Sequence, residues 1–339
     1  MEPDENTLVQ DNLTDIETNN TDTKGLTEIL LTKLCNQYEI GKLLFFSTIA
    51  LASEDQNLCF QTDKGEYIAK VFAENRTIED IEKEIEVTNK MIEEGFQHPQ
   101  LYKNNEGKFI TTDSDTKQNI LVMDFAEGES FVKLQRPPRW KETTRIAEQT
   151  TLIHHTDYKP TDIKEKWAIS NIHTLYKEAS ETRNFPVTDL ELIRQAVAMY
   201  QSIPLDKLPH CLVHGALTKN NVLRKKWEEV IILNFSASDY LPRIHELAVM
   251  ASDLLQDETL RVPEPLEVKT KYLVKLFNRL DPEFPITKIE REYLYSYTIA
   301  ATAVSLMKGY SELQKTGKVN REFKLGHNIL MNELFRRNY

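Results

Sequence analysis

The chain has 339 residues, of which 40% are hydrophobic and 28% are charged. This composition excludes a wholly disordered protein and is typical of one large or two medium globular units. The net charge of -11 comes mainly from the first 23 residues, which hold seven acids and no Lys or Arg, whereas the remainder carries 42 bases against 46 acids. The body of the chain therefore lacks the basic excess that binds nucleic acid.

The cysteines and the apolar runs argue against further classes of protein. The three cysteines lie far apart and form no CxxC pair, which argues against structural disulfides and a zinc site. The longest apolar run, near residues 43–52, is about half of the ~20 residues that a membrane helix needs. The chain opens without the basic and apolar pattern of a secretory signal. We therefore expect a cytoplasmic protein with neither a membrane nor a nucleic-acid partner.

The N-terminal third divides into an acidic tail and a mixed unit. Residues 1–24 are rich in Asn, Thr and Asp, so we expect a disordered tail that ends near Gly25. Residues 25–126 then alternate between helical and strand patterns. Helices are expected over residues 26–38 and 76–94, and strands over 42–51, 57–62, 66–72, 109–111 and 120–125. This order predicts a small, mainly antiparallel β unit with one helix inserted after the third strand.

Helical spacing dominates residues 127–339. Helices are expected over residues 144–155, 167–181, 190–201, 244–255, 266–280 and 289–316, with short strands at 211–213, 222–223 and 230–233. The fold class is therefore α+β, with a small β unit followed by a large helical unit.

One segment of the helical unit carries a motif with chemical content. His214-Gly215-Ala216-Leu217 is followed by Asn221, an apolar run ends at Asn234, and a Glu-Leu-Ala triplet begins at Glu246. This pattern resembles the aminoglycoside phosphotransferase and choline kinase family, which are small-molecule kinases built on the two-lobed protein-kinase-like fold. In that family the loop reads His-Gly-Asp-Leu and later Asn, the apolar strand ends in Asp, and the triplet is Asp-Leu-Ala.

The resemblance also implies nucleotide-binding residues in the first lobe. Lys70 corresponds to the lysine that binds the phosphates of ATP, and Asn57 to the Asn beyond the nucleotide loop. The hinge strand is implied at residues 121–128, so Met123, Asp124 and Ala126 are expected beside the nucleotide. An acid on the inserted helix should pair with the lysine. Among the acids there, Glu84 lies nearest the apolar stripe, roughly 70° from its centre at ~100° per residue.

Two substitutions remove the carboxylates that phosphoryl transfer requires. The family's proton-accepting Asp is Ala216 here, and its metal-binding Asp is Asn234. Loss of a general base costs roughly 10²–10⁴-fold in rate, and Mg²⁺ prefers carboxylates and phosphates to a neutral amide. Asn221 remains as a metal ligand and His214 as a residue that orients the loop, so Mg²⁺ binding is expected to be weak. Ordinary kinase chemistry should be absent or very slow.

Three readings stay open on this sequence. The first is a pseudokinase that binds a nucleotide, a small molecule or a protein. The second is an active ATP-dependent phosphotransferase acting on a small-molecule hydroxyl, with Asp239 or Glu246 replacing the lost acids. We regard those two as structural acids. The third is an active kinase inactivated by deliberate substitution at both positions. The nucleotide loop, residues 52–57, also lacks glycine and carries two acids that would repel phosphate.

Overall fold

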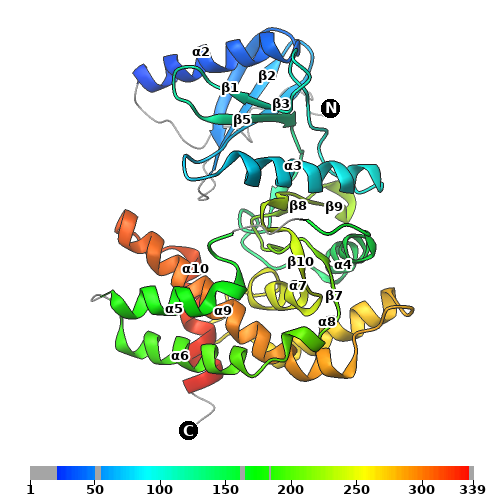
Figure 1. Ribbon diagram of the computed structural model, residues 1–339, viewed down its shortest axis with the longest axis vertical. Coiled ribbons are helices and arrows are strands. Elements are labelled where there is room, and N and C mark those ends of the chain that lie inside the picture. Colours follow the sequence, from blue (N-terminus) through cyan, green and yellow to red (C-terminus); the bar gives the residue numbers. More distant parts are fainter. Residues whose placement is uncertain (1–20, 50–54, 161–164, 183–184, 336–339) are drawn as a thin grey trace, which may run out of the picture. The chain divides into compact units, whose positions relative to one another are not determined.

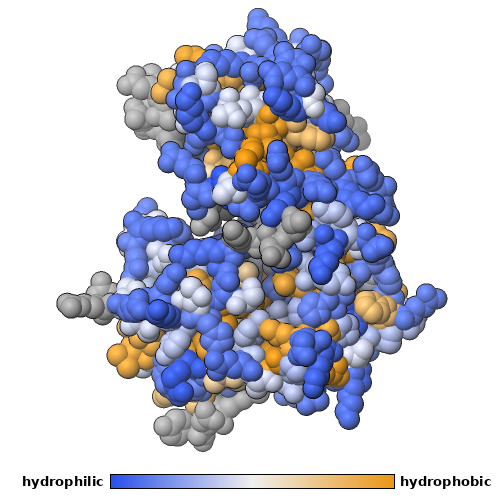
Figure 2. All heavy atoms as spheres, viewed as in Figure 1, coloured by the Kyte–Doolittle hydropathy of each residue, from blue (hydrophilic) through white to orange (hydrophobic). Residues whose placement is uncertain are grey.

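The computed structural model describes residues 21–49, 55–160, 165–182 and 185–335. The chain forms two compact units, Met1–Ile81 with Pro99–Ala126 and Glu82–His98 with Glu127–Tyr339. Each is described by itself below, with the elements labelled in Figure 1. Figure 2 shows hydrophilic residues over most of the face of each unit that is in view.

The first unit is built on one antiparallel sheet, as predicted. Its elements are α2 (Thr21–Gln37), β1 (Leu43–Ile49), β2 (Gln56–Thr62), β3 (Glu66–Val71), β4 (Ile110–Thr112) and β5 (Asn119–Asp124). The strands lie in the order β1-β2-β3-β5-β4, and every neighbouring pair is antiparallel. The expected turn between β2 and β3 is present, because Gln61 lies opposite Glu66.

Alternation along these strands divides the sheet into two faces. Residues of one face pack against α2 in a single core, which contains Leu31, Leu34, Leu58, Phe60, Tyr67, Ala69, Val71, Ile120 and Val122. Figure 1 shows α2 lying along the sheet. Because successive side chains of a strand point to opposite faces, Asn57 and Lys70 belong to the face that α2 does not cover.

Helix α2 corrects the expected boundary at Gly25. The helix begins at Thr21 and continues through Gly25, so the chain does not break there. A glycine inside a helix costs about 0.5–1 kcal/mol relative to alanine, which the burial of Leu31 and Leu34 on the sheet offsets. The rest of the predicted disordered tail, residues 1–20, lies outside the described residues.

Helix α3 (Ile78–Glu93) belongs to both units. Val87 and Met91, together with Phe96 beyond its end, pack in the core of the helical unit. Residues 82–98 therefore group with residues 127–339, although the sequence reading assigned the whole of 25–126 to the first lobe. The helix stops at the predicted Gly95, which adopts a left-handed conformation with φ +85°.

The second unit is mainly helical, with short strands that frame its loops. The helices are α4 (Trp140–His155), α5 (Ile172–Glu181), α6 (Val187–Gln201), α7 (Ile244–Val249), α8 (Leu266–Leu280), α9 (Lys288–Thr316) and α10 (Arg321–Leu330). Strands β6 (Glu129–Ser130), β8 (Val222–Arg224) and β9 (Val230–Ile232) form one sheet, and β7 (His210–Val213) pairs with β10 (Asp239–Pro242). The sequence reading did not predict β6, β10 or α10. In the described part of the chain, no helix has both the length and the apolar character needed to cross a membrane.

A wide turn follows α7. Residues Met250–Leu254 form a π-helical turn, in which the Leu255 N–H donates to the Met250 carbonyl. The predicted helix over 244–255 is therefore present, but its second half is widened by the longer hydrogen bond.

Helices α9 and α10 cross at two glycines. A Cβ on Gly309 would overlap the backbone nitrogen of Phe323, and one on Gly326 would lie against the backbone of Leu306. These glycines let the two helix backbones approach closely, which no larger residue would allow without movement.

We expect Gly309→Ala to lower the free energy of unfolding by about 1–3 kcal/mol, because overpacking must push α10 away from α9. Gly25→Ala is the matched control, since Gly25 is also helical but has no atom within 4 Å of the added Cβ. That change should stabilise the protein by about 0.5–1 kcal/mol. Urea unfolding followed by circular dichroism measures both, and equal effects of the two substitutions would contradict the close crossing.

Candidate functional site

Strands β2 and β3 bring two of the predicted nucleotide-binding residues together. Asn57 and Lys70 are direct partners in the antiparallel register of these strands. Lys70 is buried, with 7% of its surface exposed. A buried cation with an amide residue as its cross-strand neighbour is suited to an anionic ligand.

An acid that the motif comparison did not single out contacts Lys70. The Asp55 carboxylate lies 3.3 Å from the Lys70 Nζ and 3.7 Å from the Arg76 guanidinium. It also accepts a hydrogen bond from the Ala73 N–H at 3.0 Å. The two acids of residues 52–57 are a partial sequence signal for this contact, because they disfavour phosphate there. The lysine is thus neutralised by a carboxylate of its own unit.

The remaining predicted nucleotide residues lie at the end of β5 and on α3. Met123 and Asp124 end β5, and the Asp124 carboxylate accepts a hydrogen bond from the Tyr102 hydroxyl at 2.8 Å. Ala126 is the last residue of the first unit. Glu84 is buried on α3 with 5% exposure. Its pairing with Lys70 stays a prediction, because the two residues belong to different units.

The motif loop of the second unit is held by His214. Its Nδ1 accepts a hydrogen bond from the Ala216 N–H at 3.3 Å, and its Nε2 donates to the Leu233 carbonyl at 3.0 Å. Desolvation lowers the pKa of this imidazole to about 4, so it is neutral at pH 7. The ring packs against Phe235. These contacts match the orienting role expected of His214.

Glu246 holds the same loop from the opposite side. Its carboxylate accepts hydrogen bonds from the backbone N–H groups of His214 and Gly215. The side chain is fully buried, and burial raises the pKa of the carboxyl to about 7, against the opposing effect of those backbone donors. Glu246 is therefore a structural acid of the loop, as the sequence reading preferred, and it does not face solvent as a general base would.

Gly215 is confined by its surroundings. It adopts φ +81°, and a Cβ there would overlap the carbonyl oxygen of Ala237. Its own carbonyl accepts a hydrogen bond from the buried His245 Nε2 at 3.2 Å. The loop thus keeps its backbone conformation although residue 216 carries only a methyl group.

The two residues expected to hold a metal bind each other. The Asn234 Nδ2 lies 3.4 Å from the Asn221 Oδ1, and the Asn221 Nδ2 donates to the Ala216 carbonyl at 2.9 Å. In the described part of the chain, no three His, Cys, Asp or Glu side chains are grouped so as to hold a metal ion. Mg²⁺ requires oxygen ligands and favours carboxylates. Two neutral amides that share a hydrogen bond do not fit it.

Asp239 follows Asn234 by five residues and begins β10, where its backbone pairs with Val213. Its carboxylate accepts the N–H of Tyr240 at 2.7 Å. These contacts agree with a structural acid, and that role stays a prediction.

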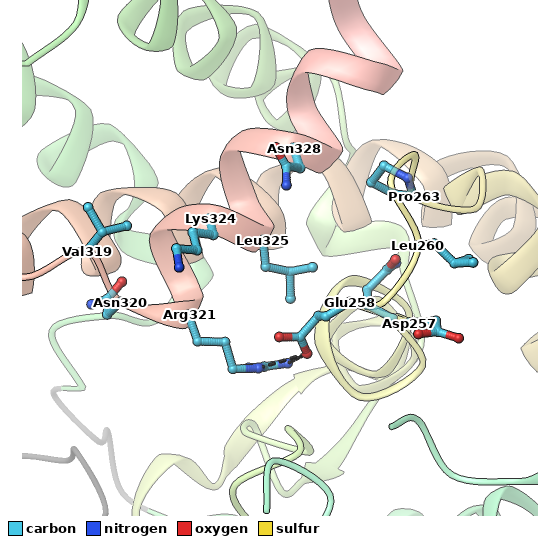
Figure 3. Close-up of a pocket in the computed structure, with 11 residues that line it drawn as sticks. Asp257, Glu258, Leu260, Pro263, Val319, Asn320, Arg321, Lys324, Leu325 and Asn328 are labelled. Carbon is cyan, nitrogen blue, oxygen red and sulfur yellow. Dashed lines mark hydrogen bonds and ion pairs between the residues drawn. The ribbon is translucent and has the colours of Figure 1, made fainter. Parts of the chain in front are cut away.

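A pocket of about 330 Å³ lies in the helical unit. Its walls are the segment after the π-helical turn and helix α10, and its lining residues are Gln256, Asp257, Glu258, Leu260, Pro263, Val319, Asn320, Arg321, Lys324, Leu325 and Asn328. Figure 3 shows Arg321 and Glu258 pointing toward each other at its edge. The sequence reading missed this site, because helix α10 was not predicted and no short motif marks its residues.

Ion pairs connect this pocket to the motif loop. Lys219, three residues after Ala216, donates its backbone N–H to Asp253 at 2.8 Å and its Nζ to Glu258 at 2.7 Å. Arg321 bridges the same two acids, at 2.6 Å from Asp253 and 2.9 Å from Glu258. The Lys219 side chain is 1% exposed. Two cations and two acids thus form one closed group between loop and pocket.

We expect Glu246 to contribute a fall in the free energy of unfolding as pH rises from about 4.5 to about 7, because folded Glu246 retains a proton that the unfolded chain has lost. The buried histidines His154, His214 and His245 contribute a rise over the lower part of this window, because they are neutral in the folded protein and protonated in the unfolded chain. The contribution of Glu246, on the order of 1 kcal/mol per pH unit, is therefore measured as the difference between the slopes of the wild type and Glu246→Gln. In Glu246→Gln this part of the slope should vanish. Glu312→Gln, a change of an ion-paired acid on α9, is the control and should keep it. Urea unfolding at several pH values decides, and an unchanged slope in Glu246→Gln would contradict the raised pKa.

Comparisons with known proteins agree with this geometry. A structure of a choline kinase from Streptococcus pneumoniae superposes with a TM-score of 0.64 at 11% identity, covering 91% of this chain and 99% of that one. A spectinomycin phosphotransferase in complex with ADP and spectinomycin gives a TM-score of 0.59 at 14% identity, covering 89% and 93%. At such identities the likeness establishes the fold.

The relatives found by sequence cover a smaller part of the chain than the solved structures do. A homoserine kinase from Bradyrhizobium sp. (strain ORS 278) is 24% identical over 210 residues, which span 60% of this chain and 62% of that protein. The family model described as phosphotransferase enzyme family matches residues 47–269, well over half of the chain. The resemblance to aminoglycoside phosphotransferases and choline kinases is confirmed, and the chain belongs to the phosphotransferase enzyme family.

Proposed function

We propose that this protein is a pseudokinase of the phosphotransferase family, which binds a nucleotide-type ligand and a small polar molecule without transferring phosphate between them. The observation that carries the proposal is the hydrogen-bonded pair of amides, Asn221 and Asn234, beside the methyl group of Ala216. A phosphoryl-transfer site needs a base for the hydroxyl proton and a metal that neutralises phosphate charge. Neither requirement is met by these three side chains.

Retention of the surrounding structure supports a binding role. His214, Gly215 and Glu246 keep the loop in a defined conformation without the catalytic carboxylates. Solved relatives are complexes with ADP and spectinomycin, or with AMP-PNP, Ca²⁺ and an amicoumacin-type ligand. The first unit has the Asn57–Lys70 pair at the positions that the family uses for the nucleotide. The substitutions at positions 216 and 234 remove the carboxylates needed for phosphoryl transfer but leave the loop contacts and the Asn57–Lys70 pair present.

The pocket beside α10 is our candidate for the second ligand. It is joined to the Ala216 loop through Lys219 and lined by both acids and bases. Homoserine, choline and spectinomycin, which the relatives are named for, are all alcohols that carry an amine or ammonium group. The carboxylate of Asp257 suits such a group. These three compounds are therefore the first probes.

We expect the wild-type protein to show at least about 10⁴-fold less Mg²⁺-dependent phosphorylation of these alcohols than the roughly 1–100 s⁻¹ of active kinases, because base and metal carboxylate are both missing. The measurement is transfer of the γ-phosphate of ATP, followed by mass spectrometry. The double variant Ala216→Asp with Asn234→Asp should raise the rate, whereas Asn220→Asp adds an acid to the same loop outside the motif and should not. Turnover by the wild type at ordinary kinase rates would refute the pseudokinase proposal.

We expect Asn328→Trp to weaken binding of the pocket ligand at least about tenfold, because the ring would fill space that the ligand needs, and desolvated contacts with charged groups are worth over 1.4 kcal/mol. Ala198→Trp, on the exposed face of α6, is the control. Calorimetric titration with each probe measures the affinity, and circular dichroism checks that both variants fold. Equal affinities in the two variants would place the ligand elsewhere.

A further inference from the structure

In the first unit, the carboxylate of Asp55 is bound by groups of the kind that bind phosphate. We define the Asp55 cluster as Asp55, Lys70, Arg76, Phe72 and the Ala73 N–H. Two cations and one backbone N–H lie next to the carboxylate: Lys70 at 3.3 Å, Arg76 at 3.7 Å and the Ala73 N–H at 3.0 Å. The side chains of Asp55, Lys70 and Arg76 are 10%, 8% and 15% exposed. The cluster is thus largely withdrawn from water.

The ring of Phe72 fixes both cations in the cluster. The Lys70 Nζ lies 5.0 Å and the Arg76 Cζ 5.7 Å from the ring centroid, which are cation–π distances. Phe72 itself is 1% exposed. Because the ring is held by the core, Lys70 and Arg76 are positioned by packing as well as by Asp55.

The cluster has the composition of a phosphate site that is already filled. Phosphate binding relies on cations together with backbone N–H groups, and the cluster supplies two cations and one N–H. The anion that they bind is the Asp55 carboxylate. Kinases pair this lysine with an acid on the inserted helix and still bind ATP, but Asp55 comes from the nucleotide loop and is an additional carboxylate at Lys70. A phosphate approaching Lys70 would have to displace it or stay beside it, and two anions a few ångströms apart repel each other where water is excluded.

A ligand without phosphates is not repelled by the Asp55 carboxylate. The charge of Asp55 acts on Lys70 and Arg76, whereas a nucleoside offers uncharged groups to the end of strand β5. We propose that Asp55 is a specificity-determining residue, which occupies the phosphate position at Lys70 and selects nucleoside-type ligands that lack a polyphosphate over ATP. This inference rests on the proposed nucleotide-type site and goes beyond it by naming the ligand class.

Calorimetric titration in EDTA with adenosine, ATP and tripolyphosphate tests the proposal. The wild-type protein should bind adenosine at least as tightly as ATP and should not bind tripolyphosphate. In Asp55→Asn, ATP and tripolyphosphate should each gain at least about tenfold in affinity, because a neutral amide leaves both cations available. The affinity for adenosine should change by less than about threefold, since no charge is involved.

Two further variants isolate the local effect. Glu106→Gln removes an exposed acid of the same unit, which pairs with Lys108, and therefore matches the change in net charge without touching the cluster. It should leave all three affinities unchanged. Adding Lys70→Met to Asp55→Asn should cancel the gain for ATP and tripolyphosphate. Circular dichroism verifies folding of each variant.

The outcomes separate this inference from the proposed function. Wild-type binding of tripolyphosphate, or of ATP more than about tenfold more tightly than adenosine, overturns the role of Asp55. A folded Asp55→Asn protein without any gain for tripolyphosphate does the same. If that variant does not fold, the wild-type titrations with tripolyphosphate and ATP decide. Gain of tripolyphosphate binding with no adenosine binding supports the role of Asp55 and instead refutes the nucleotide-type site.

Discussion

The Glu246 carboxylate lies away from solvent and accepts the backbone N–H groups of His214 and Gly215. The position and conformation of the motif loop depend on this interaction. His214 can then reach the Leu233 carbonyl, and Asn221 can reach the Ala216 carbonyl. The contacts that hold the loop are therefore made without the side chain at position 216.

Two buried clusters of cations are each neutralised by carboxylates of the same unit. Asp55 neutralises Lys70 in the first unit, and Asp253 and Glu258 neutralise Lys219 and Arg321 in the second. In both clusters the protein itself supplies the anions that match the buried cations. Buried pairs of this kind are costly to break, because the remaining charge would be left without a partner. They therefore hold the side chains of both clusters in fixed positions.

The parts of the fold that sequence could predict are those governed by local periodicity. Alternating residues gave the β2 and β3 strands with their turn, and the apolar stripe gave α3 up to Gly95. The motif residues could be placed because their spacing is fixed by a single loop. What could not be predicted depends on distant partners. The Asp55–Lys70 pair joins residues 15 positions apart. Helix α10 does carry local signals, an apolar stripe and an Asn320 side chain that accepts the Phe323 N–H, but the close crossing with α9 at Gly309 is visible only in the structure.

The π-helical turn at Met250–Leu254 determines which way the following residues point. In an α-helix each residue advances the chain by ~100° around the axis, so one extra residue in a turn rotates everything beyond it by about that angle. Asp253 lies inside this turn and Glu258 shortly after it, and both reach Lys219 and Arg321. The helix ends at Leu255, so the angle at which the π-helical turn ends sets the direction in which the segment carrying Glu258 leaves it. A change of a single residue in the length of this turn would uncouple the motif loop and the pocket while leaving every amino acid of the pocket in place.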